Sequence, residues 1–154
     1  MEKIIINNLN DGKKLAYQIA HSLRGGEVIG LIGDLGAGKT TFTQFLAKAL
    51  GVNKSVSSPT FNVIKIYSIN EDKTVAHFDK KYLGKKRLIH IDAYRLHSPD
   101  ELVAMGIEEY FNDKNYITII EWADKIKQLL PKRTIFIKIK VLKNQTDRTF
   151  QIAG

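Results

Sequence analysis

The sequence predicts an α/β fold, in which a mostly parallel central sheet is flanked by helices and antiparallel strands lie at its edges. Three apolar runs of strand length, at residues 27–32, 88–91 and 116–120, have the composition of strands buried on both faces. Residues 134–142 and 148–152 are two further strand-like runs joined by a polar turn, which predicts an antiparallel hairpin. The length of 154 residues is typical of one domain, residues 1–154.

The N-terminal half supplies the first elements of this fold. Residues 3–6 read as a short strand, and Asn10 or Asp11 is expected to cap the helix that follows and ends at Gly25 and Gly26. A second helix is predicted at 41–50, since its apolar residues recur at helical spacing.

The segments beyond it are less regular. Residues 61–67 are expected to form a strand, and residues 74–78 a second strand that pairs back with it. Ser98 has the features of an N-cap and is expected to start a helix that runs towards Phe111. A short helix is expected at 123–130, before Pro131.

A glycine-rich motif joins the strand at 27–32 to the helix at 41–50. It matches G-x-x-x-x-G-K-[ST], the phosphate-binding P-loop, and its context of strand, loop and helix indicates a P-loop NTPase. The glycines allow the backbone to approach a polyphosphate, and its N–H groups then bind anionic oxygens. We expect Lys39 to contact phosphate and the hydroxyl of Thr40 to bind Mg²⁺. The predicted nucleotide-binding residues here are Gly33, Asp34, Leu35, Gly36, Ala37, Gly38, Lys39, Thr40 and Thr41.

Polar residues end the other buried strands. Asp92 follows the strand at 88–91 and Glu121 follows the strand at 116–120. Ligands of open α/β sheets bind at the carboxyl ends of the strands, so both carboxylates are expected to face the phosphates, where each could hold Mg²⁺ or orient the attacking water. Thr60 is expected in a segment that senses the γ-phosphate through its hydroxyl. Trp122 packs in the core or flanks the nucleotide.

The absence of two motifs narrows the choice of nucleotide base. An N-K-x-D motif and a D-x-x-G motif are typical of GTPases, and neither is present. Adenine is therefore the expected base, which makes ATP and Mg²⁺ the expected cofactors. Two alternatives to an ATP hydrolase stay open: a P-loop kinase for a small metabolite, and a nucleotide-gated binding module.

The amino-acid composition indicates which environment and which partners the protein is suited to. There is no cysteine, and no apolar run approaches the roughly 20 residues of a membrane helix, so no membrane association is expected. The net charge of +8 favours phosphate-rich partners. Residues 79–87 form a basic segment that either contacts the phosphate backbone of RNA or is a solvated loop.

Several motifs together resemble the TsaE (YjeE-type) ATPase family. In order along the chain, they are the P-loop, Ser-Pro-Thr-Phe at 58–61, His-Ile-Asp-Ala-Tyr-Arg-Leu at 90–96, Glu-Leu at 101–102, Gly-Ile-Glu-Glu-Tyr at 106–110 and Ile-Glu-Trp at 120–122. These motifs cover most of residues 25–130. The resemblance implies a cytoplasmic ATPase that works with TsaB and TsaD to install the threonylcarbamoyl group beside the anticodon of tRNA, without being the transferase itself.

The resemblance also implies residue roles. Lys39 would bind phosphate, Thr40 and Glu121 would hold Mg²⁺, and Asp92 would be essential for hydrolysis. Thr60 would lie in a switch-like loop. Two further residues would join the nucleotide site: Trp122 would be functionally important beside it, and Lys132 would lie near the adenine.

One departure from the family pattern concerns its His-Phe-Asp motif. The stretch between Tyr67 and His90 is longer than expected, and it contains a second match to that motif at 77–79. We assign the functional carboxylate to Asp92 rather than Asp79, because only Asp92 follows a buried strand and precedes Tyr-Arg-Leu.

Overall fold

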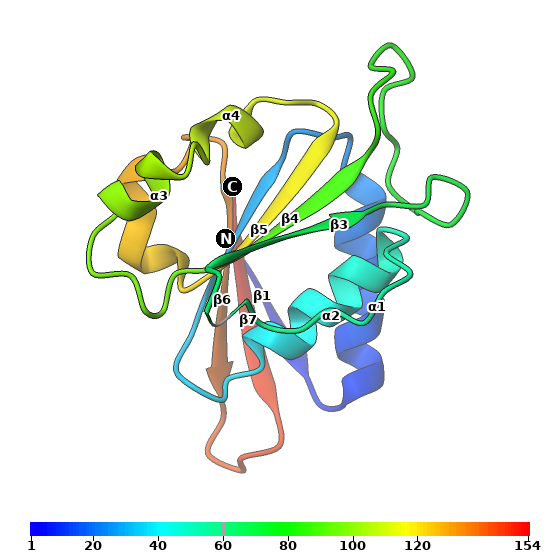
Figure 1. The fold of residues 1–154 in the computed structure, drawn as a ribbon. Helices are drawn as coiled ribbons and strands as arrows, with labels where there is room; N and C mark the ends of the chain where they lie inside the picture. Colours follow the sequence, from blue (N-terminus) through cyan, green and yellow to red (C-terminus); the bar gives the residue numbers. More distant parts are fainter. Residues whose placement is uncertain (60) are drawn as a thin grey trace.

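The computed structural model describes residues 1–59 and 61–154. Within these residues, seven strands form one sheet in the order β1-β7-β6-β2-β5-β4-β3 (Figure 1). In this order the strands are β1 (Glu2–Ile6), β7 (Arg148–Ala153), β6 (Ile135–Val141), β2 (Val28–Ile32), β5 (Tyr116–Glu121), β4 (Arg87–Asp92) and β3 (Ile64–Ser68).

The centre of the sheet is parallel and its edges are antiparallel. Strands β6, β2, β5 and β4 run in one direction. Strand β3 pairs antiparallel with β4, and β7 pairs antiparallel with both β6 and β1. This arrangement confirms the predicted fold class, including the hairpin near the C-terminus.

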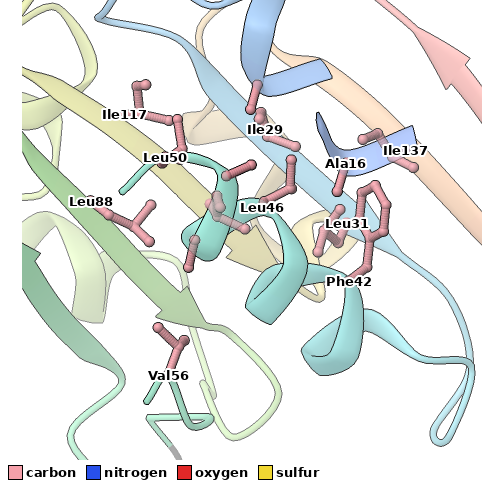
Figure 2. Packing of buried hydrophobic residues seen from close by; sticks show 14 of the residues in the cluster. Ala16, Ile29, Leu31, Phe42, Leu46, Leu50, Val56, Leu88, Ile117 and Ile137 are labelled. Atoms are coloured by element: carbon pink, nitrogen blue, oxygen red, sulfur yellow. The ribbon is translucent and has the colours of Figure 1, made fainter. Parts of the chain in front are cut away.

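Helices cover both faces of the sheet (Figure 1). Helices α1 (Leu9–Ser22) and α2 (Lys39–Ala49) pack on one face, and α3 (Asp100–Ala104), α4 (Glu108–Phe111) and the 3₁₀ helix η1 (Ala123–Leu129) pack on the other. Figure 2 shows the first interface, where Phe42 and Leu46 of α2 and its C-cap residue Leu50 meet Leu31 of β2 and Leu88 of β4. Burial of these apolar side chains stabilises the sheet–helix layers. No helix in the described part of the chain is long and apolar enough to cross a lipid bilayer.

The cap of α1 differs from the prediction. Asn8, not Asn10 or Asp11, is the N-cap residue, and its side-chain oxygen accepts a hydrogen bond from the N–H of Asp11 at 2.9 Å. Asp11 lies in the first turn instead, where its negative charge interacts favourably with the positive end of the helix dipole.

The helix expected from Ser98 to Phe111 is divided in two. Gly106 lies between α3 and α4 with a φ of 75°, a left-handed conformation that ends a helix. The expected cap is also displaced, since Pro99 rather than Ser98 is the N-cap residue of α3. The carboxylate of Glu101 accepts a hydrogen bond from the N–H of His97.

Residues 69–86, here called the insertion, form no second hairpin strand. The N–H of Val75 donates to the carbonyl of Ala49, and the N–H of His77 donates to the carbonyl of Leu23. Backbone groups that a hairpin would have used therefore bond to the ends of α2 and α1. The insertion joins the end of β3 to the start of β4, so it lies at the opposite end of the sheet from Asp92.

Candidate functional site

The P-loop connects β2 to α2, as its sequence context predicted. Gly36 and Gly38 have φ values of 80° and 106°, a conformation that favours glycine, and a Cβ on either would meet no atom within 4 Å. Gly33 is different, because a Cβ there would lie 2.6 Å from the carbonyl oxygen of Ile139. The loop is thus open on the side where a phosphate could approach and tightly packed where it leaves the sheet.

Lys39 lies at the start of α2 and is only 5% exposed. Its Nζ donates to the carbonyl oxygens of Gly33 at 2.6 Å and Asp34 at 2.9 Å, and it lies 3.9 Å from the centre of the Trp122 ring. Burial lowers the pKa of Lys39 below its ordinary value of 10.5, and the carboxylates of Glu121 and Asp92 partly oppose this shift. The ammonium group of Lys39 is therefore held within the P-loop, where it is expected to bind phosphate.

Thr40 and Glu121 meet across the site. The hydroxyl of Thr40 donates to Oε2 of Glu121 at 2.8 Å, and the hydroxyl of Thr43 lies 3.4 Å from Oε1. Glu121 is the last residue of β5 and is only 2% exposed. A hydroxyl and a carboxylate from different elements thus share one small volume.

Asp92 ends β4 directly beside Glu121, since the two residues are register partners in adjacent parallel strands. Its Oδ2 accepts a hydrogen bond from the hydroxyl of Ser58 at 2.5 Å, and its Oδ1 accepts from the N–H of Tyr94 at 2.9 Å. Asp79, the competing candidate, lies in the insertion, where its carboxylate accepts from the N–H of Lys81. The structure therefore brings Asp92, and not Asp79, to the P-loop.

Trp122 has a left-handed backbone with a φ of 60°, which is uncommon for a bulky residue. Its ring contacts that of Tyr94, with centroids 4.8 Å apart, as well as Lys39. Trp122 therefore packs against the core cluster on the α3 face of the sheet and also lies beside the P-loop lysine.

Two hollows flank the P-loop. One of about 410 Å³ is lined by Thr40, Asp92, Glu121 and Trp122, together with Ser58. It gathers the polar groups of the site.

The second hollow, of about 370 Å³, is lined mainly by apolar side chains, including Ile6, Leu9 and Phe45, and also by Thr146 and Arg148. Gly36, Gly38 and Thr41 line both hollows. A molecule with an anionic chain and a flat apolar group could therefore occupy both at once.

The polar hollow has ligands suited to Mg²⁺. Magnesium prefers oxygen ligands and is commonly held by one or two side chains together with phosphate oxygens. Adjacent ligands of an octahedral Mg²⁺ lie about 3.0 Å apart, close to the 2.8 Å between the Thr40 and Glu121 oxygens. Within the described residues there is no group of three His, Cys, Asp or Glu that could hold a metal by itself. The residues present therefore fit a metal shared with a phosphate group.

Two further predicted residues remain, Thr60 and Lys132. Thr60 lies outside the residues that the structure describes. Lys132 is exposed and precedes β6, next to Arg133, whose guanidinium bonds to the carbonyls of Gly26 and Phe111. Gly26 precedes β2 whereas the P-loop follows it, so the structure places Lys132 at the other end of the sheet from the P-loop.

Sequence reasoning missed three polar contacts of the site. These are Ser58 on Asp92, and Thr43 and His90 on Glu121. One signal was available, because His90 and Asp92 are two residues apart in a strand and must share a face of the sheet.

Comparisons with known proteins agree with this geometry. A model of the family "Threonylcarbamoyl adenosine biosynthesis protein TsaE" matches residues 6–150. The chain is 37% identical over 140 residues to a Rickettsia felis protein named tRNA threonylcarbamoyladenosine biosynthesis protein TsaE, covering 90% of this chain and 72% of that one. It is 38% identical over 133 residues to the Bacillus subtilis protein of the same name, covering 86% and 73%.

A solved structure is also similar. The crystal structure of Bacillus subtilis YdiB superposes with a TM-score of 0.70 at 30% sequence identity, covering 98% of this chain and 83% of that one. The chain therefore belongs to the TsaE family of proteins for threonylcarbamoyladenosine biosynthesis in tRNA.

Proposed function

We propose that this protein is a Mg²⁺-dependent ATPase, acting in the cytoplasm as a single domain of residues 1–154. We propose further that it works with TsaB and TsaD in the threonylcarbamoyladenosine modification of tRNA, and that its ATP hydrolysis activates or resets that assembly. The transfer of the threonylcarbamoyl group itself would belong to the partners. The observation that carries the proposal is the convergence of Lys39, Thr40, Asp92 and Glu121 on one hollow beside the P-loop.

In this proposal the two hollows divide the nucleotide between them. The N–H groups of residues 33–41 bind the phosphates, and Lys39 exchanges its carbonyl partners for phosphate oxygens. The adenine occupies the apolar hollow, between Leu9 and Phe45, because a flat aromatic base is best desolvated there. Lys132 lies too far along the sheet to contribute to this base site.

Thr40 and Glu121 would hold Mg²⁺, which neutralises charge on the transferring phosphate. Asp92 would orient the attacking water through the carboxylate that Ser58 and Tyr94 now fix. The ring of Trp122 would keep Lys39 directed into the loop. Thr60 remains a proposed γ-phosphate contact on sequence grounds alone.

We also propose that tRNA is reached mainly through the partner proteins. The basic segment 79–87 lies in and next to the insertion, at the far end of the sheet from the P-loop. Lys86 within it is buried and donates to the carbonyl oxygens of Tyr82 and Gly84 and to the side chain of Asn115, so its charge is used internally. Binding of tRNA to this protein alone should therefore be weak.

The deciding experiment measures phosphate release from ATP with and without TsaB and TsaD, in Mg²⁺ and in EDTA. We expect slow turnover by the protein alone, faster turnover with the partners, and none in EDTA. A turnover rate that is unchanged when TsaB and TsaD are added would contradict the proposed role. Phosphate transfer to a nucleoside or sugar would identify a kinase instead, and tight ATP binding without turnover in any mixture would identify a nucleotide-gated binding module.

A further inference from the structure

His90 is a fully buried histidine that contacts the proposed metal ligand. None of its surface is exposed, and its Nε2 lies 2.9 Å from Oε1 of Glu121. It comes from β4, whereas Glu121 comes from β5. An imidazole buried this deeply is fixed in orientation by its surroundings and could hold its partner still.

The sheet geometry explains why these two side chains meet. His90 is opposite Ile119 in the register, and Glu121 is two residues further along β5. All three side chains lie on the α2 face of the sheet, because alternate residues of a strand share a face. An imidazole is long enough to reach the diagonal neighbour on the adjacent strand.

The hydrogen bonds indicate which nitrogen of His90 carries the proton. Nδ1 is buried and has no hydrogen-bond partner among the described residues, whereas Nε2 faces a carboxylate oxygen. A buried N–H without an acceptor is costly, and a carboxylate can only accept. A proton on Nε2, with none on Nδ1, satisfies both conditions, so Nε2 of His90 donates to Oε1 of Glu121.

The carboxylate of Glu121 therefore accepts hydrogen bonds on both of its oxygens. Oε1 faces Nε2 of His90 and the hydroxyl of Thr43, and Oε2 accepts from Thr40. Thr40 is the other proposed metal ligand, so its bond to Oε2 is the one that metal binding would replace. The contact with His90 lies on the other oxygen and is compatible with a bound metal.

We propose that His90 is a positioning residue, which fixes the carboxylate of Glu121 in the orientation that Mg²⁺ binding requires. This inference rests on the proposed function, since it assumes that Thr40 and Glu121 bind the metal. Partners of metal ligands contribute in this way because a ligand that is already oriented loses less freedom on binding. Their removal typically lowers metal affinity about 10–100-fold.

The test compares two amide side chains that differ only in reach. Three bonds separate Cβ from Nε2 in glutamine, as in the path through Cδ2 of histidine, whereas the nitrogen of asparagine reaches only the position of Nδ1. His90→Gln should therefore keep the donor to Glu121, and His90→Asn should lose it. Both variants bury one amide, so their costs of burial are similar. His90→Leu removes the donor without adding a polar group.

The measurement is ADP affinity by calorimetry, in Mg²⁺ and in EDTA, for each variant. We expect ADP affinity in EDTA to be unchanged in all of them. The increase in affinity caused by Mg²⁺ should fall about 10–100-fold in His90→Asn and His90→Leu, and should stay within about threefold of wild type in His90→Gln. Thr40→Ala is the positive control and should lose the increase entirely.

The possible results separate this inference from the proposed function. If Thr40→Ala loses the Mg²⁺ effect but His90→Asn keeps it, His90 has only a structural role and the inference is wrong. The same conclusion follows if His90→Asn lowers thermal stability without changing the Mg²⁺ effect. If the ADP affinity of the wild type is the same in Mg²⁺ and in EDTA, the proposed metal site is itself wrong. Should His90→Leu fail to fold, the comparison of glutamine with asparagine still decides.

Discussion

Asp92→Asn is the substitution that tests the proposed chemistry most directly. Asparagine keeps the shape of the side chain and can still accept from the N–H of Tyr94 at the position of Oδ1. It removes the negative charge and replaces Oδ2, the acceptor for Ser58, with an N–H₂ group. The site would therefore keep its outline and lose the group proposed to orient water.

The expected magnitudes follow from these contacts. A positioned general base contributes about 10²–10⁴-fold to a rate, which corresponds to about 2.7–5.4 kcal/mol of activation free energy. Loss of the charge-assisted bond from Ser58 should cost about 1.5–3 kcal/mol in unfolding free energy, or about 3–12 °C in Tm for a chain of this size. Domains are typically stable by about 5–15 kcal/mol, so the variant should stay folded while its turnover falls.

The assay measures single-turnover phosphate release, ADP affinity and Tm for the same preparations. Trp122 is the only tryptophan in the sequence and lies against Lys39, so its fluorescence should report ADP binding directly. We expect ADP affinity to change by no more than about threefold, because Asp92 is not a proposed phosphate or metal ligand.

Asp79→Asn is the matched control, since it makes the same chemical change in the similar motif of the insertion. It should leave hydrolysis unchanged. The reasoning would be refuted if Asp92→Asn kept turnover within about threefold of wild type, or if Asp79→Asn reduced it equally.

Three further predictions concern stability. Lys86→Met leaves three partly exposed oxygen acceptors without their donor and should cost about 1–2 kcal/mol in urea denaturation, whereas the exposed Lys85→Met should cost nothing measurable. Gly33→Ala places a Cβ 2.6 Å from the carbonyl oxygen of Ile139 and should cost about 1–3 kcal/mol by the same method; a stability equal to wild type would show that the loop can move aside. Leu46→Ala removes most of a fully buried side chain and leaves a cavity in the core, so it should cost about 2–5 kcal/mol in thermal unfolding.

The part of the site that could be predicted from sequence depends on strand ends. Asp92 and Glu121 each follow a run of apolar residues, and parallel strands deliver their ends to the same edge. That reasoning needs only that the two strands are parallel and close. Their register, with Asp92 opposite Glu121, and their places in the sheet depend on pairing between distant segments, which a local pattern does not encode.

The errors have a common physical cause. Residues 74–78 have strand-like composition, but the N–H groups of Val75 and His77 bond to carbonyls at the ends of two helices. A local pattern shows that a backbone can be extended and does not show where its hydrogen bonds go. Lys132 illustrates the same limit, because β6 runs parallel to β2 and the residues before it therefore lie at the end of the sheet away from the P-loop.

The contacts that the sequence missed follow a rule that the structure makes visible. Along the α2 face of β4, the side chains change from Leu88 to His90 to Asp92, from apolar to charged. Helix α2 changes in the same direction, since Leu46 packs over the apolar end and Thr40 lies at the polar end. The hydrophobic core and the site are therefore two ends of one interface. A polar residue midway along it, such as His90, can be fully buried and still act on the site.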